Sequence, residues 1–548
     1  MKSWIAVLLF LFSTQIFAQT EAIKYLPVQD SGRVKPYDTF AQEALRMIYG
    51  RDTFNGKVAT DVILTWMMIP EYWERVELIN IPHSGLRDYL KLDHDKKRFK
   101  PVEIFMNDRT PLLFQELRGV EQKNDKMNLF YQEAQKLENQ LTLFRAISTG
   151  LAIRVLPAED PNGVWTSVAE LQGPAREKFN KIIKTFATVA AQVTEGETLS
   201  KAKKKEVSEK VKTSVEEFKE FADYPETVNM TKVNVEVLYN QVDVFMWSWV
   251  FYLFAGILLL IPWLSKEPKP FFLKAGWSMA FLAFFLHTLG FVIRVYLIGR
   301  PPVSNMYETV LWVPWGAVFF AFILEYVYKR HIILIASCFM AVLCLILSGL
   351  SPNVLDPSLQ PLQPVLRSTF WLATHVLIIT ISYGAFLLSW GIGNFVLTAY
   401  LLDAEKYKKQ IQHSSVAIHR SNQIGVVLLA AGIILGGIWA DYSWGRFWGW
   451  DPKETWALIA LLGYLAVLHA KISRWISHFG QAAWSVVSFA LVVMAWYGVN
   501  YVLGAGLHSY GFGAGGVEYV SGVVVVQLLF VFYVYLVRVY KKPNQLKD

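Results

Sequence analysis

Long apolar stretches dominate the second half of the chain, whereas its first part mixes polar and apolar positions. From Phe245 onward, apolar runs of membrane-spanning length recur and predict nine transmembrane helices. These runs cover residues 245–264, 275–297, 309–328, 332–350, 376–402, 424–440, 455–470, 482–504 and 520–540. The pattern predicts an all-α polytopic membrane protein with an N-terminal, mainly helical soluble domain outside the cytoplasm.

The N-terminal residues 1–20 carry one lysine, an apolar core and a small residue at Ala18. This is the pattern of a secretory signal peptide, and an uncleaved membrane anchor is the alternative. Either interpretation places residues 21–242 outside the cytoplasm as a soluble domain, followed by a transmembrane domain over 243–548. Within the soluble domain, the Lys- and Glu-rich segment 199–222 predicts a solvated helix without a binding role.

The basic residues indicate which way the chain crosses the membrane. If the soluble domain is outside, the predicted inner segments and the inner end of the last helix, with Arg538, hold fifteen Lys and Arg, and the predicted outer loops hold four. Because Lys and Arg collect in cytoplasmic loops, this bias predicts a cytoplasmic C-terminus. The formal charge of +8 is then a sign of topology, and we expect no nucleic acid as a partner.

Composition excludes several classes of protein. The chain is 53% hydrophobic and 18% charged, whereas soluble domains carry about 25% charged residues. Its two cysteines, Cys338 and Cys344, both lie in an apolar run. This excludes a disulfide-stapled domain, a Cys-rich zinc or iron–sulfur site and a CxxCH haem attachment site on the chain itself.

Four of the ten histidines are candidate functional residues because of their predicted depth in the membrane. The other six fall in predicted inner loops or the soluble domain, where solvated side chains are expected: His83, His94, His331, His413, His419 and His478. His287 and His469 lie within predicted membrane helices, where an ionisable group either has a function or bonds to a neighbouring carbonyl. His375 and His508 fall at outer helix ends on either side of loop 441–455. Two imidazoles can hold a haem iron from opposite faces, and a zinc site is disfavoured because no carboxylate or Cys joins the pair.

The loop between the sixth and seventh predicted helices is rich in tryptophan. Five of the 20 Trp fall within residues 439–456: Trp439, Trp444, Trp448, Trp450 and Trp456. Gly445 lets the backbone approach a flat ligand, and Trp444 and Trp448 share one face if the turn is helical. Arg446 and Lys453 could meet carboxylates at the ligand's edge. A porphyrin with its two propionates fits these features, and a quinone is the alternative ligand.

The loop also carries a resemblance to a known family. Its sequence Trp444-Gly445-x-x-Trp448-x-Trp450-Asp451-Pro452-Lys453-Glu454-Thr455-Trp456 resembles the WWD signature of haem-handling proteins. The downstream Tyr464…Leu468-His469, the segment 507–511 and the segment 287–308 resemble the CcsA/ResC branch, which serves system II cytochrome c maturation. The resemblance covers about residues 275–540.

The resemblance implies a set of haem ligands. Two outer histidines, His375 and His508, would be the axial ligands of a haem b iron beside the WWD loop. An inner haem site would use His469, with its second ligand supplied by a CcsB/ResB-like protein; His287 belongs to a motif of the CcsA half and is a weaker candidate. The residues that would surround the porphyrin are Trp444, Gly445, Arg446, Trp448, Trp450, Asp451 and Lys453. Glu308 and Asp451 are candidates for fixing the tautomer of a ligating His.

The resemblance further implies a function and partners. The chain would be a subunit of a holocytochrome c synthase in the bacterial inner membrane, where it transports haem and takes part in joining it to the CxxCH motif of apocytochrome c. Its partners would be a CcsB/ResB-like membrane protein, apocytochrome c and thiol-reducing thioredoxin-like proteins. Two alternatives stay open: a haem exporter or chaperone without ligase activity, and a quinone-binding respiratory membrane subunit.

Overall fold

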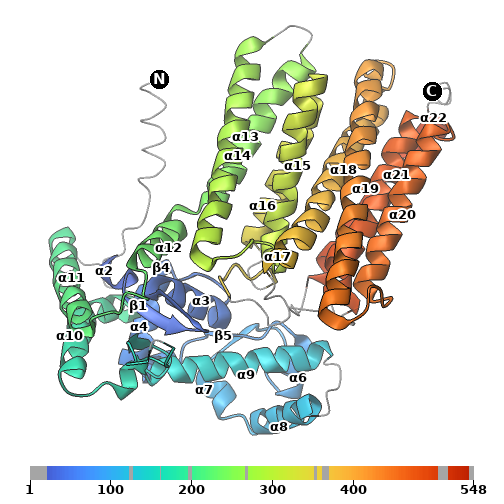
Figure 1. The fold of residues 1–548 in the computed structure, drawn as a ribbon. Helices are drawn as coiled ribbons and strands as arrows, with labels where there is room; N and C mark the ends of the chain where they lie inside the picture. The colour runs from blue at the N-terminus through green and yellow to red at the C-terminus, as the bar shows by residue number, and fades with distance from the viewer. Residues whose placement is uncertain are drawn as a thin grey trace. The chain divides into compact units, whose positions relative to one another are not determined.

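The computed structural model describes residues 21–122, 128–160, 162–195, 200–265, 269–350, 354–360, 369–503 and 516–541. The chain divides into two units, Met1–Gln241 and Val242–Asp548 (Figure 1). Helices predominate in both, and nine helices within the described ranges are long and apolar enough to cross a membrane. The predicted fold class, an all-α polytopic membrane protein with a helical N-terminal region, is confirmed.

The N-terminal unit combines short hairpins with helices. Its strands pair as β1 (Pro27–Asp30) with β2 (Arg33–Pro36), β3 (Thr53–Phe54) with β4 (Lys57–Val58), β5 (Ile79–Asn80) with β6 (Arg98–Phe99), and β7 (Arg154–Leu156) with β8 (Thr166–Ser167). Its helices are α2 (Glu21–Lys24), α3 (Tyr37–Tyr49), α4 (Ala59–Met68), α5 (Pro70–Trp73), α6 (Ser84–Tyr89), α7 (Pro101–Phe105), α8 (Arg109–Gln122), α9 (Leu129–Ser148), η2 (Val168–Glu170), α10 (Gly173–Glu195), α11 (Lys201–Ala222) and α12 (Met230–Val242). Ser31 and Gly32 join β1 to β2 with φ values of 50° and 78°, which is the turn that suits a two-residue hairpin.

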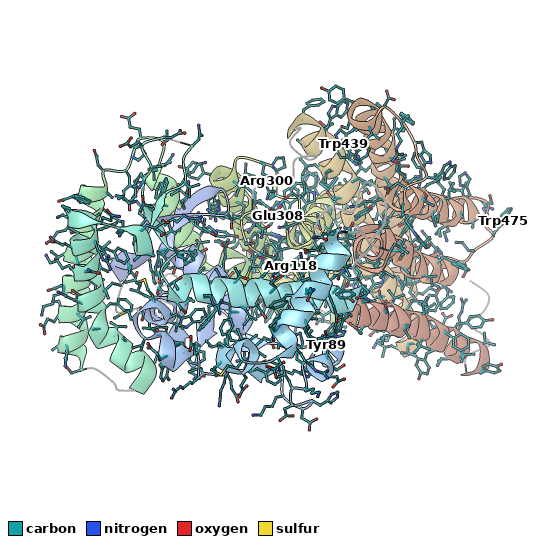
Figure 2. All side chains as sticks on the ribbon, turned by 90° about the horizontal axis from the view of Figure 1, so that it is seen from below. Tyr89, Arg118, Arg300, Glu308, Trp439 and Trp475 are labelled. Atoms are coloured by element: carbon teal, nitrogen blue, oxygen red, sulfur yellow. The ribbon has the colours of Figure 1, made fainter. Side chains whose placement is uncertain are left out.

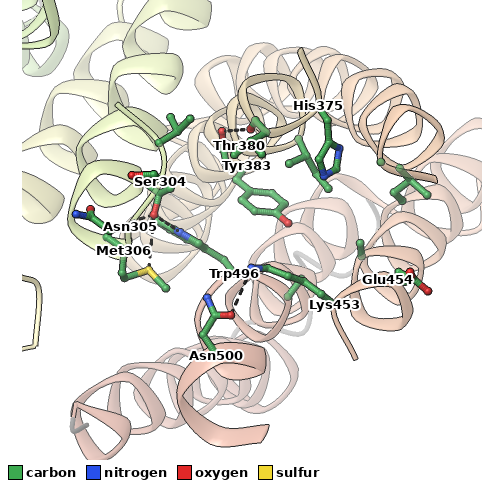
Figure 3. Close-up of a pocket in the computed structure, with 18 of the residues that line it drawn as sticks. Ser304, Asn305, Met306, His375, Thr380, Tyr383, Lys453, Glu454, Trp496 and Asn500 are labelled. Atoms are coloured by element: carbon green, nitrogen blue, oxygen red, sulfur yellow. Dashed lines mark hydrogen bonds between the residues drawn. The ribbon is translucent and has the colours of Figure 1, made fainter. Parts of the chain in front are cut away.

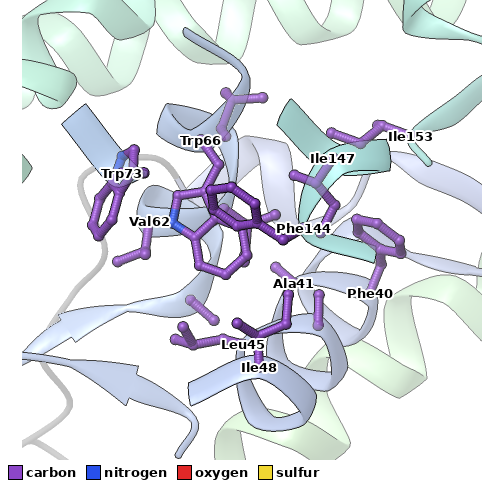
Figure 4. Close-up of a cluster of buried hydrophobic side chains, with 14 of the residues drawn as sticks. Phe40, Ala41, Leu45, Ile48, Val62, Trp66, Trp73, Phe144, Ile147 and Ile153 are labelled. Atoms are coloured by element: carbon purple, nitrogen blue, oxygen red, sulfur yellow. The ribbon is translucent and has the colours of Figure 1, made fainter. Parts of the chain in front are cut away.

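An aromatic core holds this unit together, with α3, α4 and α9 around it (Figure 4). The ring of Trp66 lies 5.3 Å from Phe144 and 6.0 Å from Trp73 between centroids, and Trp66 and Trp73 are fully buried. Trp73 Nε1 donates a hydrogen bond to Thr65 Oγ1 at 3.0 Å, so this indole is buried without an orphaned donor. Truncating such a ring to alanine costs about 3–5 kcal/mol.

The helix predicted over residues 199–222 is present as α11 but is not solvated on all sides. Val211, Val215 and Phe218 are buried, and the Phe218 ring meets Phe179 of α10 edge-on at 5.4 Å. The Lys and Glu residues cover the other faces, because the apolar residues recur at helical spacing.

The membrane unit consists of long helices that run alongside one another (Figure 1). They are α13 (Val244–Leu264), α14 (Pro270–Ile298), α15 (Met306–Tyr328), α16 (Ile332–Leu350), α17 (Thr369–Trp371), η4 (Leu372–Val376), α18 (Leu377–Asp403), α19 (Lys408–Trp444), α20 (Pro452–Ile472), α21 (His478–Val493), η5 (Met494–Leu503) and α22 (Val517–Lys541). Helix α18 packs against α15, α16, α19, α21 and α22. Gly384 permits the close approach of α15 to α18, because a Cβ there would lie 2.6 Å from the Val313 carbonyl oxygen.

One predicted helix begins much earlier than expected. The sequence placed residues 403–423 in an inner loop because they are polar, yet α19 starts at Lys408. Ile411 and Ile418 are buried, whereas Arg420 is exposed, so this extension is an amphipathic helix. A search for uniformly apolar stretches does not detect such a segment. His413 and His419 therefore lie on a helix and not in a loop.

Candidate functional site

A cavity of about 430 Å³ lies at one end of the membrane unit (Figure 3). Its volume is within the range of small-molecule sites, about 300–1,000 Å³. The lining residues come from segments far apart in the sequence, namely 303–309, 354–360, 375–383, 433–439, 448–457 and 495–501. Most of this lining is apolar or aromatic, so a few polar side chains determine what the cavity can bind.

His375 lines the cavity from η4, a short π-helical segment directly before α18. Such segments are frequent at functional sites. Nδ1 of His375 donates to the carbonyl oxygen of Gly432 at 2.8 Å, so the neutral ring carries its lone pair on Nε2, as a metal ligand must. The Trp439 ring stacks on the imidazole with centroids 5.9 Å apart. The partner that fixes this tautomer is a backbone carbonyl, and not Glu308 or Asp451 as the sequence suggested.

Gly436 of α19 makes room for the His375 ring. A Cβ at Gly436 would lie 2.5 Å from Cε1 of His375, closer than real Cβ atoms approach. We therefore expect Gly436→Ala to displace the imidazole from Gly432 and, if the cavity holds haem as the family resemblance implies, to lower the haem bound to the purified chain about tenfold, equivalent to about 1.4 kcal/mol. Gly522→Ala in α22 is the matched control, because a Cβ there meets nothing within 4 Å. Equal haem content in the two variants would contradict this assignment.

The tryptophan loop begins where α19 ends at Trp444, because Gly445 has a φ of 67°. The turn is not helical beyond this point, so the condition under which Trp444 and Trp448 would share one face is not met. Trp448 lines the cavity, as does Trp439, and Trp444 packs beside Trp439 with centroids 5.2 Å apart. Trp450 is 71% exposed and has a φ of 56°, a backbone conformation that is unusual for a bulky residue. It lies outside the described cavity lining.

Glu454 organises the loop, a role that the sequence analysis did not assign. One carboxylate oxygen accepts the backbone N–H groups of Gly449 at 2.8 Å and Asp451 at 3.2 Å, and the other accepts Arg446 Nη1 at 3.3 Å. The Asp451 side chain accepts the backbone N–H of Lys453 at 2.9 Å and caps α20. The spacing Asp-x-x-Glu is that of a capping box. This local signal could have identified Glu454 in the sequence.

We expect Glu454→Gln to loosen this loop. The amide keeps the size of the side chain but loses the negative charge, and hydrogen bonds to charged groups contribute about 1.5–3 kcal/mol each. Hydrogen exchange on the full chain should show faster exchange at Gly449 and Asp451. Glu405→Gln is the control, because the Glu405 side chain is exposed and meets Lys408 only at 3.8 Å. If Gly449 and Asp451 exchange as slowly in Glu454→Gln as in Glu405→Gln, the role of Glu454 is contradicted.

The two cations that the sequence analysis proposed for binding ligand carboxylates have different positions in the structure. Lys453 lines the cavity, and its Nζ donates to Oδ1 of Asn500 at 3.3 Å. Arg446 pairs with Glu454 and lies over the Trp444 ring at 5.7 Å. It is not one of the described lining residues. Lys453 is therefore the cation of the motif that a ligand in the cavity would meet.

Helix η5 forms part of the cavity wall, which the sequence analysis did not predict. It is π-helical over Met494–Leu503, and Trp496 donates from Nε1 to Thr309 Oγ1 at 2.9 Å. The Tyr383 ring of α18 lies 6.2 Å from that indole. In sequence, these residues belong to apolar runs that read as ordinary membrane helices. Their convergence on the cavity depends on packing between helices and has no local signal.

A buried charge cluster supports one wall of the cavity, and Figure 2 labels two of its members, Arg300 and Glu308. Glu308 accepts hydrogen bonds from Arg294 at 3.1 Å and from Arg300 at 3.0 Å, and all three side chains are buried. The backbone N–H and hydroxyl of Ser304 also donate to Glu308. Both arginines donate in turn to backbone carbonyls of segment 354–360, at 3.1 and 3.0 Å. Glu308 therefore holds the wall of the cavity. Its hydrogen bonds among the described residues go to Arg294, Arg300, Ser304 and Asn305, and a role in orienting a ligating His stays a prediction.

The remaining predicted histidines lie away from the cavity or outside the described residues. His287 is fully buried in α14, and its Nε2 donates to the Leu311 carbonyl at 3.1 Å. This environment favours a structural role for His287. His469 is exposed in the last turn of α20, and its Nδ1 donates to the Leu465 carbonyl at 2.7 Å. His508 lies outside the described residues.

Comparison with known proteins extends across this site. The family model of the cytochrome C assembly protein matches residues 303–508, a range that includes all the residues described as lining the cavity. CcsA of Synechococcus sp. (strain RCC307) is 33% identical over 297 residues, covering 47% of this chain and 93% of that protein. The chain belongs to the CcsA/ResC family of cytochrome c biogenesis proteins. CcsA of Prochlorococcus marinus (strain MIT 9303) is 32% identical to this chain over 298 residues, which cover 47% of this chain and 91% of that protein.

A longer relative matches more of this CcsA-family chain. NrfI of Wolinella succinogenes is 29% identical over 505 residues, which cover 87% of this chain and 53% of NrfI. The match therefore extends into the N-terminal unit, which the CcsA relatives do not cover as a whole. The chain spans about half the length of NrfI.

Proposed function

We propose that the chain binds haem b in the described cavity, presents it at the outer face of the bacterial inner membrane and takes part in its attachment to apocytochrome c. The observation that carries the proposal is the geometry of His375. Its imidazole lines a cavity of about 430 Å³, with Nδ1 held by a carbonyl and Nε2 therefore in the form that binds iron. Stacked Trp439 and nearby Trp448 offer flat apolar surfaces to a porphyrin.

His508 is proposed as the second axial ligand. The family model ends at this residue, and the preceding helix η5 lines the cavity. Bis-imidazole coordination would fix the iron and thereby the position of the ring edge. A histidine of the incoming CxxCH motif could then replace one of the two ligands and release the product.

The attachment step adds each thiol of the CxxCH motif to a vinyl group of the substrate haem. A carbon–sulfur bond forms at one vinyl carbon, the S–H bond breaks, and the hydrogen is transferred to the other vinyl carbon. The step needs reduced thiols, which is why thiol-reducing thioredoxin-like proteins are proposed partners. The chain's own contribution is to hold and orient the ring while the thiols approach.

A CcsB/ResB-like membrane protein is proposed as the permanent or transient partner. His469 supports this proposal, because an exposed imidazole in the last turn of a membrane-spanning helix is costly without a ligand or partner. A haem held between His469 and a partner histidine would be on its way to the outer cavity. The bias of Lys and Arg between the two sides supports an outer position for the cavity.

Co-expression with a CcsB/ResB-like protein and an apocytochrome tests the proposal. We expect purified chain to show the Soret absorption of haem b, and haem-stained denaturing gels to show covalently modified cytochrome c. Haem on the chain without covalent product, unless another ligase is added, would indicate an exporter or chaperone. A chain that carries a quinone and no haem would instead support the respiratory-subunit alternative.

A further inference from the structure

We propose that the cavity contains a carboxylate-binding subsite formed by Lys453, Asn500 and Tyr383, and that this subsite takes one propionate of the porphyrin. The inference rests on the proposed function and adds to it the orientation of the porphyrin ring in the cavity. The three side chains come from α20, η5 and α18 and line the same cavity (Figure 3). Lys453 supplies the charge, and the other two supply neutral hydrogen-bond donors.

The hydrogen-bond partner of the Lys453 ammonium is neutral, and the Asp451 carboxylate is an anion that acts on it electrostatically. Its Nζ donates to Asn500 Oδ1 at 3.3 Å, and no ion pair within 4.0 Å joins it to a carboxylate among the residues that the structure describes. The neighbouring Asp451 directs one carboxylate oxygen to the backbone N–H of Lys453, where it caps α20. A cation in an apolar cavity of a membrane unit is costly without an anion in direct contact. A ligand carboxylate would provide that anion.

The other charged groups around the cavity are already engaged. The Glu454 carboxylate binds the loop backbone and Arg446, and the Asp356 carboxylate, at the exposed rim, accepts hydrogen bonds from Ser358 and Gln360. Because Arg446 is paired with Glu454, its charge is compensated within the loop. This leaves Lys453 as the cation that selects a negatively charged group inside the cavity.

Asn500 and Tyr383 complete the donor set. The Asn500 amide accepts from Lys453 through Oδ1, so its NH₂ group is the donor end that remains for a ligand. Tyr383 is 5% exposed, and Figure 3 shows its hydroxyl directed into the cavity, on the side where Lys453 and Asn500 meet. An ammonium, an amide N–H and a phenol O–H together match the oxygens of a carboxylate.

The subsite gives the ring an orientation. With the iron at His375 and a propionate at Lys453, the carboxylate edge of the porphyrin faces α20 and η5. Figure 3 shows Ser304, Asn305 and Met306 on the opposite side of the cavity from His375. We expect the vinyl edge of the porphyrin to point away from Lys453. The vinyl carbons that react with the thiols would then face the part of the cavity that α20 and η5 do not line.

The test compares two probes on the full purified chain: iron protoporphyrin IX and its dimethyl ester, in which both propionates are neutral. Soret titrations give the dissociation constant for each. We expect the free acid to bind the unmodified chain at least about tenfold more tightly than the ester, as expected for a charge-assisted contact. Lys453→Met should bring the ratio close to one, Lys453→Arg should retain most of it, and Tyr383→Phe should reduce it by a smaller factor.

One further substitution makes the assignment specific. Arg420→Met removes an exposed cation of α19 that bonds to Gln423, and it should leave the acid-to-ester ratio unchanged. Loss of the ratio in Arg420→Met, or a ratio in Lys453→Met equal to that of the unmodified chain, would overturn the assignment. Equal binding of acid and ester by the unmodified chain would overturn the subsite even if Lys453→Met does not fold. Failure to bind either porphyrin would instead contradict the proposed function.

Discussion

His375→Ala is expected to abolish cytochrome c maturation and to lower the haem content of the purified chain by at least about tenfold. The substitution removes the proposed iron ligand, and even the loss of residues that merely orient a ligand costs about 10–100-fold in metal affinity. The side chain packs against Trp439 and bonds to Gly432, so part of the loss could come from disturbed packing. Haem-stained gels report maturation, and the Soret-to-protein absorbance ratio reports haem content.

Two companion variants separate ligation from packing. His375→Gln keeps a polar side chain near Gly432 but provides no imidazole, and it should lose haem as completely as alanine. His419→Ala changes a histidine of α19 that lies outside the described cavity lining, and it should leave haem content unchanged. Normal maturation in His375→Ala, with expression equal to the unmodified chain, would show that the iron is held elsewhere.

Glu308→Gln is expected to destabilise the membrane unit by about 3–5 kcal/mol, the cost of removing one partner from a buried ion pair. Glu308 is fully buried between Arg294 and Arg300, so its neutralisation leaves two buried guanidinium groups without their carboxylate. Segment 354–360 should loosen as well, since both arginines hold its backbone carbonyls. Thermal unfolding can be followed with a thiol-reactive dye, because Cys338 and Cys344 are buried and free.

The matched control for Glu308 is an exposed carboxylate. Glu405→Gln removes a charge whose side chain is 67% exposed, and such surface changes alter stability by about 0.5 kcal/mol or less. A Glu308→Gln variant that unfolds at the same temperature as this control would contradict the structural role of the cluster. If Glu308→Gln lowers the haem content and leaves the unfolding temperature unchanged, Glu308 affects the bound ligand and not the stability of the cavity wall.

The helices of the membrane unit were largely predictable because uniform hydrophobicity is a local property of the sequence. Residues 332–350 were predicted as a helix and form α16 with the same bounds. The first part of α19 was missed because its burial is confined to one face. The π-helical segments η4 and η5 were also missed, since a helix with a changed hydrogen-bond register has the same apolar pattern as a regular one.

The candidate site was predictable only where residues are close in sequence or fixed by topology. His375 was selected by its depth in the predicted membrane, and Trp448 and Lys453 by their place in the loop. Tyr383 and Asn500 come from other helices, and their approach to the cavity depends on tertiary packing that no local pattern encodes. Trp450 carried the same signal as Trp448 but is exposed and lies outside the described cavity lining.

The central claim is that His375 binds the iron of a haem held in the described cavity. Electron paramagnetic resonance of the purified full chain, loaded with ferric haem, tests it most directly. The account predicts a low-spin signal typical of two imidazole ligands, which His375→Ala converts to a high-spin signal or eliminates, whereas His419→Ala leaves it unchanged. A chain that binds no haem, or a low-spin signal that survives in His375→Ala, would contradict the account.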